Sequence, residues 1–199
     1  MAKTMSGQKA VTPSADGILA SIEATKSRDL PPVHLWNPPF CGDIDMRIAR
    51  DGTWFYQGSP IRRERMVRLF SSILKREGEE FFLVTPVEKV GIKVDLAPFI
   101  ALDFEIVGDG AARKLIFETH VGDHFAAGPE NALRVETDPE TQAPLPLVHV
   151  RGGLDALIDR KSFYRIFDLC VERAGKFGVW SDGVFFELMS AEELGDLAD

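Results

Sequence analysis

The chain has 199 residues, of which 45% are hydrophobic and 27% charged, with a formal net charge of −8. This apolar content suffices for a folded core and excludes a wholly disordered chain, and the length allows one domain or two small ones. No apolar stretch approaches the about 20 residues of a membrane span, and the N-terminus lacks the apolar block of a secretory signal. Two cysteines are too few for a disulfide framework, so we expect a cytoplasmic protein.

The charge is unevenly placed along the chain. Residues 46–76 carry eight basic and two acidic side chains, a net of +6, which leaves −14 for the rest. A basic island on an acidic chain suits a small anion or an acidic partner, whereas the acidic remainder argues against nucleic-acid binding. The alternative is that these arginines form the solvated face of one helix.

The first half of the chain begins with polar and proline-rich segments. Residues 1–30 predict a tail with one weak helix, and residues 31–40 an extended connector with four prolines. Asp51-Gly52, flanked by strand-like residues, predicts a hairpin.

Two amphipathic helices are expected. Ser59 as the cap and Pro60 in the first turn predict a helix over residues 60–76, with Gly78 ending it. Its apolar residues recur with helical spacing. A second helix is predicted over residues 154–174.

Strands fill the chain between and after these helices. Turn residues such as Asp109-Gly110 and Asp182-Gly183 separate short apolar stretches. The predicted strands are residues 81–85, 90–96, 99–108, 114–121, 133–136 and 145–150, with a closing hairpin of 177–180 and 184–189. Ser190 and Glu193 then form a capping box at the start of an acidic tail.

The two helices resemble each other. Residues 61–76 align with residues 158–173 at a constant offset of 97, with five of sixteen positions identical. This predicts one strand–helix–strand unit used twice, although any two amphipathic helices can be brought into register. In this register Arg63 and Arg160 project onto the apolar face, where a guanidinium needs a carboxylate, a carbonyl or a ligand anion.

A set of polar residues at strand ends and turns, near the boundary of the two halves, forms the candidate ligand site. Its members are Arg63, Glu88, Lys89, Asp95, Thr119, Asp123 and Arg151. A guanidinium pair such as Arg63 and Arg151 suits a phosphate or carboxylate, because each can bind in a bidentate manner. The alternative is a network of ion pairs between the halves.

Enzymatic and metal chemistry are less well supported by the sequence. There is no phosphate-binding loop and no nucleophile elbow, and neither cysteine has a histidine nearby in sequence. His120, His124 and His149 could form a zinc site only in space, so we expect no metal and no cofactor. The enzymatic alternative is a hydrolase that uses Asp95, Asp123 and His120.

Several short motifs together resemble a known bacterial family. They are Asp51-Gly-Thr-Trp, Gly58-Ser-Pro-Ile-Arg-Arg, Leu83-Val-Thr-Pro-Val-Glu-Lys-Val, Glu118-Thr-His-Val-Gly-Asp and Val150-Arg-Gly-Gly-Leu-Asp-Ala. Over nearly all of residues 31–190 the chain resembles the family of domain of unknown function 1285. The resemblance implies a repeated structural motif and a C-terminal half superficially like pleckstrin-homology domains. It also implies a site between the halves for a nucleotide-like ligand and a role in signal transduction.

These observations predict an α+β fold of two related halves, each a curved antiparallel sheet with one long helix. The expected organisation is a tail at 1–30, modules at 31–97 and 98–190, and an acidic tail at 191–199. The predicted function is a non-enzymatic sensing or adaptor protein that binds a small anion between the halves. Nucleic acid and membrane are not expected partners, and the sequence leaves a protein partner open.

Overall fold

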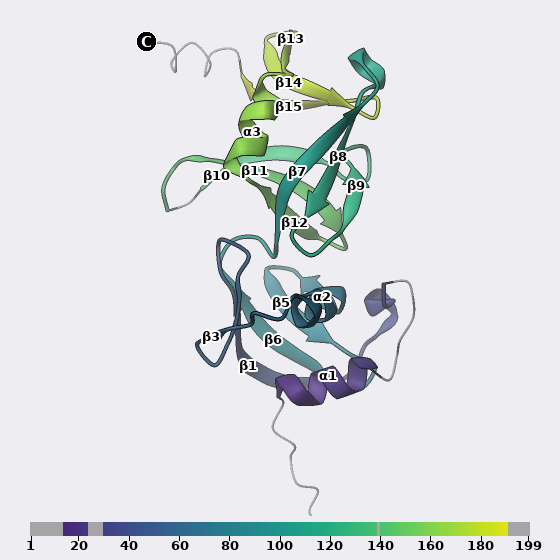
Figure 1. Cartoon of the computed structure of the whole chain (residues 1–199), viewed down its shortest axis with the longest axis vertical. Helices are drawn as coiled ribbons and strands as arrows, with labels where there is room; N and C mark the ends of the chain where they lie inside the picture. The colour runs from purple at the N-terminus through teal and green to yellow at the C-terminus, as the bar shows by residue number, and fades with distance from the viewer. Residues whose placement is uncertain (1–13, 24–29, 139, 191–199) are drawn as a thin grey trace, which may run out of the picture.

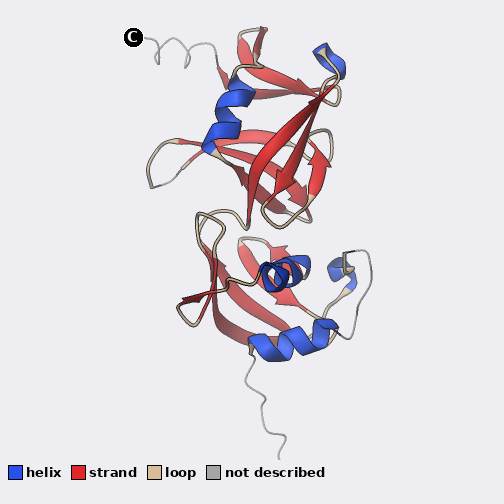
Figure 2. Ribbon diagram, viewed as in Figure 1, coloured by secondary structure: helices blue, strands red, loops and turns tan. Residues whose placement is uncertain are grey.

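The computed structural model describes residues 14–23, 30–138 and 140–190. Two six-stranded sheets, one three-stranded sheet and three α-helices make up this part of the chain (Figures 1 and 2). The predicted α+β class is confirmed. Within these residues no helix is long and apolar enough to cross a membrane. The predicted acidic tail lies outside the described residues.

The N-terminal half is built on the first six-stranded sheet. Its strands follow the order β3-β2-β1-β6-β5-β4, and all neighbours are antiparallel except the central pair of β1 and β6. Its elements are α1 (Ala15–Glu23), the 3-10 helix η1 (Val33–Leu35), β1 (Phe40–Ile48), β2 (Trp54–Tyr56), β3 (Ser59–Pro60), α2 (Glu64–Ser72), β4 (Leu74–Glu77), β5 (Glu80–Val84) and β6 (Lys89–Val94).

The C-terminal half contains the second six-stranded sheet and the small one. The larger sheet follows the order β10-β11-β12-β7-β8-β9, and the small one β13-β14-β15. The elements are β7 (Phe99–Val107), the 3-10 helix η2 (Gly110–Ala112), β8 (Lys114–Thr119), β9 (His124–Ala126), β10 (Leu133–Thr137), β11 (Pro144–Arg151), β12 (Leu154–Ile158), α3 (Arg160–Phe167), β13 (Val171–Arg173), β14 (Lys176–Ser181) and β15 (Val184–Ser190).

The two large sheets have the same strand order. Adding six to each strand number of the first sheet gives the order of the second sheet read from its other end, β9-β8-β7-β12-β11-β10. In each sheet the first and the sixth strand of that half pair in parallel at the centre. The helices are not equivalent in the same way, because α2 lies between the third and fourth strands whereas α3 follows the sixth. The helix alignment at an offset of 97 was therefore the wrong register for the repeat. A shared amphipathic spacing aligns helices wherever they occur in a fold.

Both helices are shorter than predicted. Pro60 lies in β3 and the helix begins at Glu64, while β4 pairs with β5 where the helix was expected to continue. Gly78, with φ at +65°, forms the β4–β5 turn and does not end a helix. The amphipathic spacing of α2 therefore predicted its centre but not its ends.

The second predicted helix is interrupted by strands at both ends. Residues 154–158 form β12, and residues 171–173 form β13. The helix starts after Asp159, whose carboxylate accepts the Ser162 backbone N–H at 2.8 Å. Each strand predicted from the turn and apolar pattern is found, as β5, β6, β7, β8, β10, β11, β14 and β15, and the hairpin at Asp182-Gly183 is confirmed. The strands β9, β12 and β13 were not among the predicted ones.

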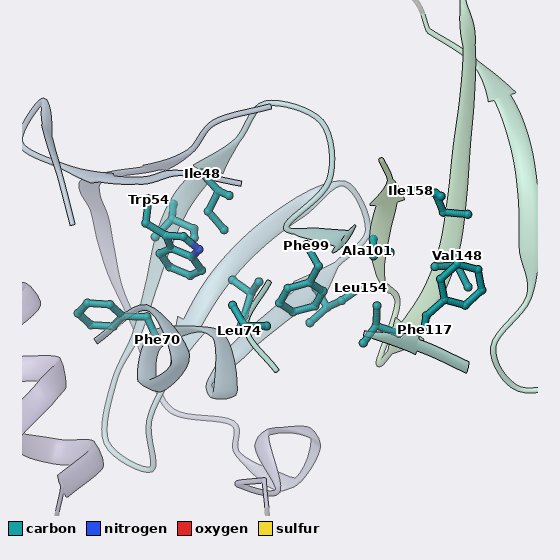
Figure 3. Packing of buried hydrophobic residues seen from close by; sticks show 14 of the residues in the cluster. Ile48, Trp54, Phe70, Leu74, Phe99, Ala101, Phe117, Val148, Leu154 and Ile158 are labelled. Atoms are coloured by element: carbon teal, nitrogen blue, oxygen red, sulfur yellow. The ribbon is translucent and has the colours of Figure 1, made fainter. Parts of the chain in front are cut away.

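One hydrophobic core runs through both halves. In the N-terminal half Trp54 stacks on Phe70 with ring centroids 6.1 Å apart. Figure 3 shows Leu74 beside Phe99 and Leu154, which belong to the other half; all three are at most 2% exposed. Burying side chains of this size stabilises a fold by about 1.5–3 kcal/mol each. The contact between the halves is thus part of the core.

Candidate functional site

Three of the predicted site residues come together where the halves meet. The Arg151 guanidinium pairs with the Asp123 carboxylate at 2.6 Å, and the Asp123 backbone N–H donates to the Thr119 hydroxyl at 3.0 Å. Arg151 also donates to the Ser71 carbonyl oxygen at 3.1 Å and lies 4.8 Å from the Phe99 ring centroid. Because Ser71 lies in the last turn of α2 and Asp123 in the β8–β9 turn, Arg151 joins the two.

A second contact between the halves involves the tip of the β1–β2 hairpin. Gly52 has φ at +80°, and a Cβ atom there would stand 2.7 Å from the Ile100 side chain and 3.3 Å from Nε2 of His120. The His120 Nδ1 accepts the Ile100 backbone N–H at 3.1 Å, so the neutral ring carries its proton on Nε2. Burial lowers the pKa of His120, although the Ile100 hydrogen bond partly opposes this shift.

This geometry predicts that stability falls on acidification. The pKa of His120 is lower in the folded state than its ordinary value of 6.5, so the unfolded chain binds the proton more tightly. His120 should thus leave stability unchanged above pH 6.5 and reduce it as the pH falls through that value. Urea unfolding between pH 7.5 and 5.0 measures this slope. The variant His120→Asn, which keeps an acceptor near Ile100, should lose this part of the slope; an identical slope would assign it to other groups.

Three other predicted residues, Glu88, Lys89 and Asp95, lie in the N-terminal half, and two of them form local ion pairs. The Lys89 ammonium binds the Glu77 carboxylate at 2.9 Å, and Asp95 binds Arg47 at 2.7 Å. Burial raises the pKa of Glu88. No hydrogen bond or ion pair joins these residues to Arg151 in the part of the chain that the structure describes. The seven residues therefore do not form one site.

Arg63 differs most from its prediction. It is exposed at the N-cap of α2 and pairs with no carboxylate among the described residues. The expectation that it projects onto the apolar face is wrong, because the helix begins after it and helical angles do not apply there. Arg160, its proposed counterpart, is also exposed.

Replacing Arg63 with alanine should therefore leave stability nearly unchanged. A substitution at an exposed residue without partners typically changes the free energy of unfolding by no more than about 0.5 kcal/mol. Urea unfolding of Arg63→Ala measures this directly. A loss of 2 kcal/mol or more on the same scale would show that Arg63 has a structural partner.

A pocket of about 360 Å³ lies between the halves. Lys75 and Arg76 of β4 line it from the N-terminal half, and Arg151 and Gly152 from the C-terminal half. Residues 30–34 of the connector complete its wall. Its lining holds three cationic side chains and no carboxylate, which favours an anion over a cation. Each of the three cations also lies within ion-pair distance of a carboxylate outside the lining: Glu77 for Lys75, Asp155 for Arg76 and Asp123 for Arg151.

The cations of this pocket are held in place by neighbouring groups. Nε of Arg76 donates to the Gly78 carbonyl at 2.8 Å, and Nη1 donates to the Gly153 carbonyl across the interface at 3.3 Å. Lys75 pairs with Glu77 at 3.0 Å. The sequence predicts Lys75 and Arg76 at the end of a helix, whereas both lie in β4. Their position in the basic segment 46–76 is the sequence feature that points to anion binding.

A buried charge network supports Arg76 from the C-terminal half. Asp155, 8% exposed, accepts two hydrogen bonds from Arg134, at 2.8 and 3.2 Å, and lies 3.7 Å from Arg76. Burial opposes ionisation of Asp155, but Arg134 holds its pKa below the usual value. The carboxylate is therefore ionised at neutral pH and fixes both guanidinium groups.

The three histidines considered as metal ligands have separate partners. Nδ1 of His149 lies 3.2 Å from Asp155, and His124 lies 3.7 Å from Glu118. His120 accepts the backbone N–H described above. Among the described residues, no three His, Cys, Asp or Glu side chains are grouped as a metal site requires.

The proposed hydrolase residues are likewise distributed over different interactions. Asp95 pairs with Arg47, and Asp123 with Arg151. A carboxylate oxygen that binds a guanidinium is directed at that partner and not at a substrate. Burial raises the pKa of the Cys170 thiol to about 12, which disfavours a nucleophilic thiolate.

Comparison with known proteins identifies the family. Models of the N-terminal domain of DUF1285, a domain of unknown function, and of the C-terminal domain of the same family match residues 31–97 and 98–188. A DUF1285 family protein from Silicibacter pomeroyi DSS-3 is 65% identical, with a TM-score of 0.85 over 92% of this chain and 100% of that one. Another from Shewanella baltica OS155 is 24% identical, with a TM-score of 0.49 over 63% and 91%. No curated protein matches. The chain therefore belongs to the DUF1285 family.

Proposed function

We propose that this protein is a non-enzymatic sensing or adaptor protein that binds a small anion in the pocket between its halves. The observation that carries the proposal is the pocket lining, in which Lys75, Arg76 and Arg151 are the charged residues and no carboxylate is present. The resemblance described above suggests a nucleotide-like anion and a role in signal transduction.

The arrangement suits a sensor because each half supplies part of the pocket. The strand β4 contributes Lys75 and Arg76, and the end of β11 and the turn after it contribute Arg151 and Gly152. Arginine can bind phosphate or carboxylate through two parallel hydrogen bonds. An anion that contacts both halves favours the arrangement of the halves that fits it, and a partner can detect that shift in population.

The hydrolase alternative is less well supported by these contacts. Its two carboxylates, Asp95 and Asp123, are each paired with an arginine, and Nδ1 of His120 accepts a backbone hydrogen bond. A general base needs a lone pair directed at substrate, whereas these groups are engaged in structural interactions. The contacts favour a binding role.

A thermal-shift series with pyrophosphate, AMP and ATP, and with neutral adenosine as control, tests this function. A ligand present at 100 times its dissociation constant stabilises the fold by about 2.7 kcal/mol, which raises the melting temperature by about 5–10 °C for a chain of this length. We expect at least one anion to produce such a rise. Adenosine should not.

The matched variants are Arg76→Gln and Arg65→Gln, which remove the same charge from the pocket and from the exposed face of α2. Arg76→Gln should abolish the rise and Arg65→Gln should keep it. Loss of the rise in both variants, or in Arg65→Gln alone, would place the anion on α2 and contradict the proposal. An absence of any rise with all three anions would contradict it as well.

A further inference from the structure

A second, larger cavity lies beside α3 and is lined by the C-terminal half and by Arg50 of the N-terminal half. Its volume is about 700 Å³, within the range of about 300–1,000 Å³ typical of small-molecule sites. Apolar side chains from β11, β12, α3 and β15 form most of its wall. They include Leu145, Pro146, Leu157, Phe163, Phe167 and Met189. None of them lines the pocket between the halves.

Four charged residues border this cavity, and three of them are engaged. Arg50 pairs with Asp138, which is only 2% exposed and also accepts the Glu140 backbone N–H at 2.9 Å. Asp159 accepts the Ser162 N–H at the start of α3. The remaining charge is Arg160.

Arg160 is exposed at the start of α3, and it lines the same cavity. Its guanidinium lies 6.0 Å from the Tyr164 ring centroid and pairs with no carboxylate among the described residues. An arginine in this state keeps all its N–H donors for a ligand, and its planar fork matches a carboxylate.

We propose that this cavity binds a single-chain amphipathic carboxylate, with its alkyl chain against the apolar wall and its head group on Arg160. The apolar lining favours burial of methylene groups, because it removes them from water. Among the described residues that line this cavity, Arg160 is the one cation without a carboxylate partner, which matches a ligand with one negative charge. A nucleotide with several charges matches the three cations of the pocket between the halves better. The inference is therefore independent of the function proposed above.

Calorimetric titration of the full chain with decanoate, decanol and decyltrimethylammonium tests the role of the charge. A hydrogen bond to a charged group corresponds to about tenfold or more in affinity. Decanoate should thus bind at least about tenfold more tightly than the other two probes. Equal affinity for all three would overturn the proposal, because it would assign binding to the alkyl chain alone.

The matched variants are Arg160→Gln and Lys161→Gln, which remove one charge each from neighbouring exposed residues of α3. Lys161 does not line the cavity. Arg160→Gln should lower the affinity for decanoate to that for decanol, and Lys161→Gln should leave it unchanged. An unchanged affinity in Arg160→Gln would overturn the assignment of the head group.

The position of the ligand can be read from the methionine methyl groups by NMR. Met189 lines the cavity, whereas Met46 is 1% exposed in the core of the N-terminal half. Decanoate should shift the Met189 methyl resonance, assigned with Met189→Leu, and leave that of Met46 in place. A shift confined to Met46 would overturn the proposal.

Residues 191–199 are the competing occupant, because they follow β15 directly and Met189 of that strand lines the cavity. A chain lacking these residues should bind decanoate with the affinity of the full chain. Binding that occurs only after their deletion would assign the cavity to this segment and overturn the proposal.

Discussion

Gly52→Val should lower the free energy of unfolding by about 2–5 kcal/mol, the largest effect that we expect from a substitution in a turn. Two costs add. A branched residue at a φ of +80° is strained by about 1–2 kcal/mol, and its Cβ would stand 2.7 Å from Ile100, an overpacking that typically costs about 1–3 kcal/mol. Urea unfolding at pH 7.5 measures the sum.

Gly58→Val is the matched control. Gly58 has a similar φ of +73°, but a Cβ atom there meets nothing within 4 Å. This variant should therefore show only the backbone cost of about 1–2 kcal/mol. Equal losses in the two variants would contradict the close contact between the hairpin tip and the C-terminal half.

Arg151→Ala should cost about 3–5 kcal/mol, because it leaves the Asp123 carboxylate without its partner. The two side chains are only 23% and 19% exposed, so water compensates little for the lost ion pair. The variant also removes the hydrogen bond to Ser71 and the contact with the Phe99 ring. The measurement is urea unfolding at neutral pH and at low and high salt.

Arg47→Ala provides the comparison. Its ion pair with Asp95 is 2.7 Å long, close to that of Arg151, but the partners are 45% and 35% exposed. Exposed pairs contribute at most about 1 kcal/mol and are screened by salt. If both variants lost the same small amount, Arg151 would not be the connection between the halves that the geometry indicates.

Much of the sheet structure could be predicted from the sequence, because turn residues and alternating apolar residues are local features. The turns at Asp51-Gly52 and Asp182-Gly183 are examples. The ends of the helices could not. Residues 154–158 continue the apolar spacing of α3, yet they form β12 because β7 and β11 are available on both sides. That competition is decided by tertiary contacts, which a helical spacing does not contain.

The candidate site could be predicted only where its residues depend on local features such as turns. Thr119, Asp123 and Arg151 flank turns, where polar side chains meet, and they do lie together. Lys75 and Arg76 were not predicted as site residues, because their position in the pocket depends on the pairing of β4 with β5. Arg63 was selected on helical angles that begin one residue later.

The most direct test of the anion pocket is a crystal structure with selenate, whose anomalous scattering locates each bound anion. The account predicts a peak within hydrogen-bond distance of Arg76 and Arg151, and its loss in crystals of Arg76→Gln. The two arginines of α2, Arg65 and Arg68, are exposed, pair with no carboxylate among the described residues and are the rival site. Selenate on these arginines with an empty pocket would contradict the account.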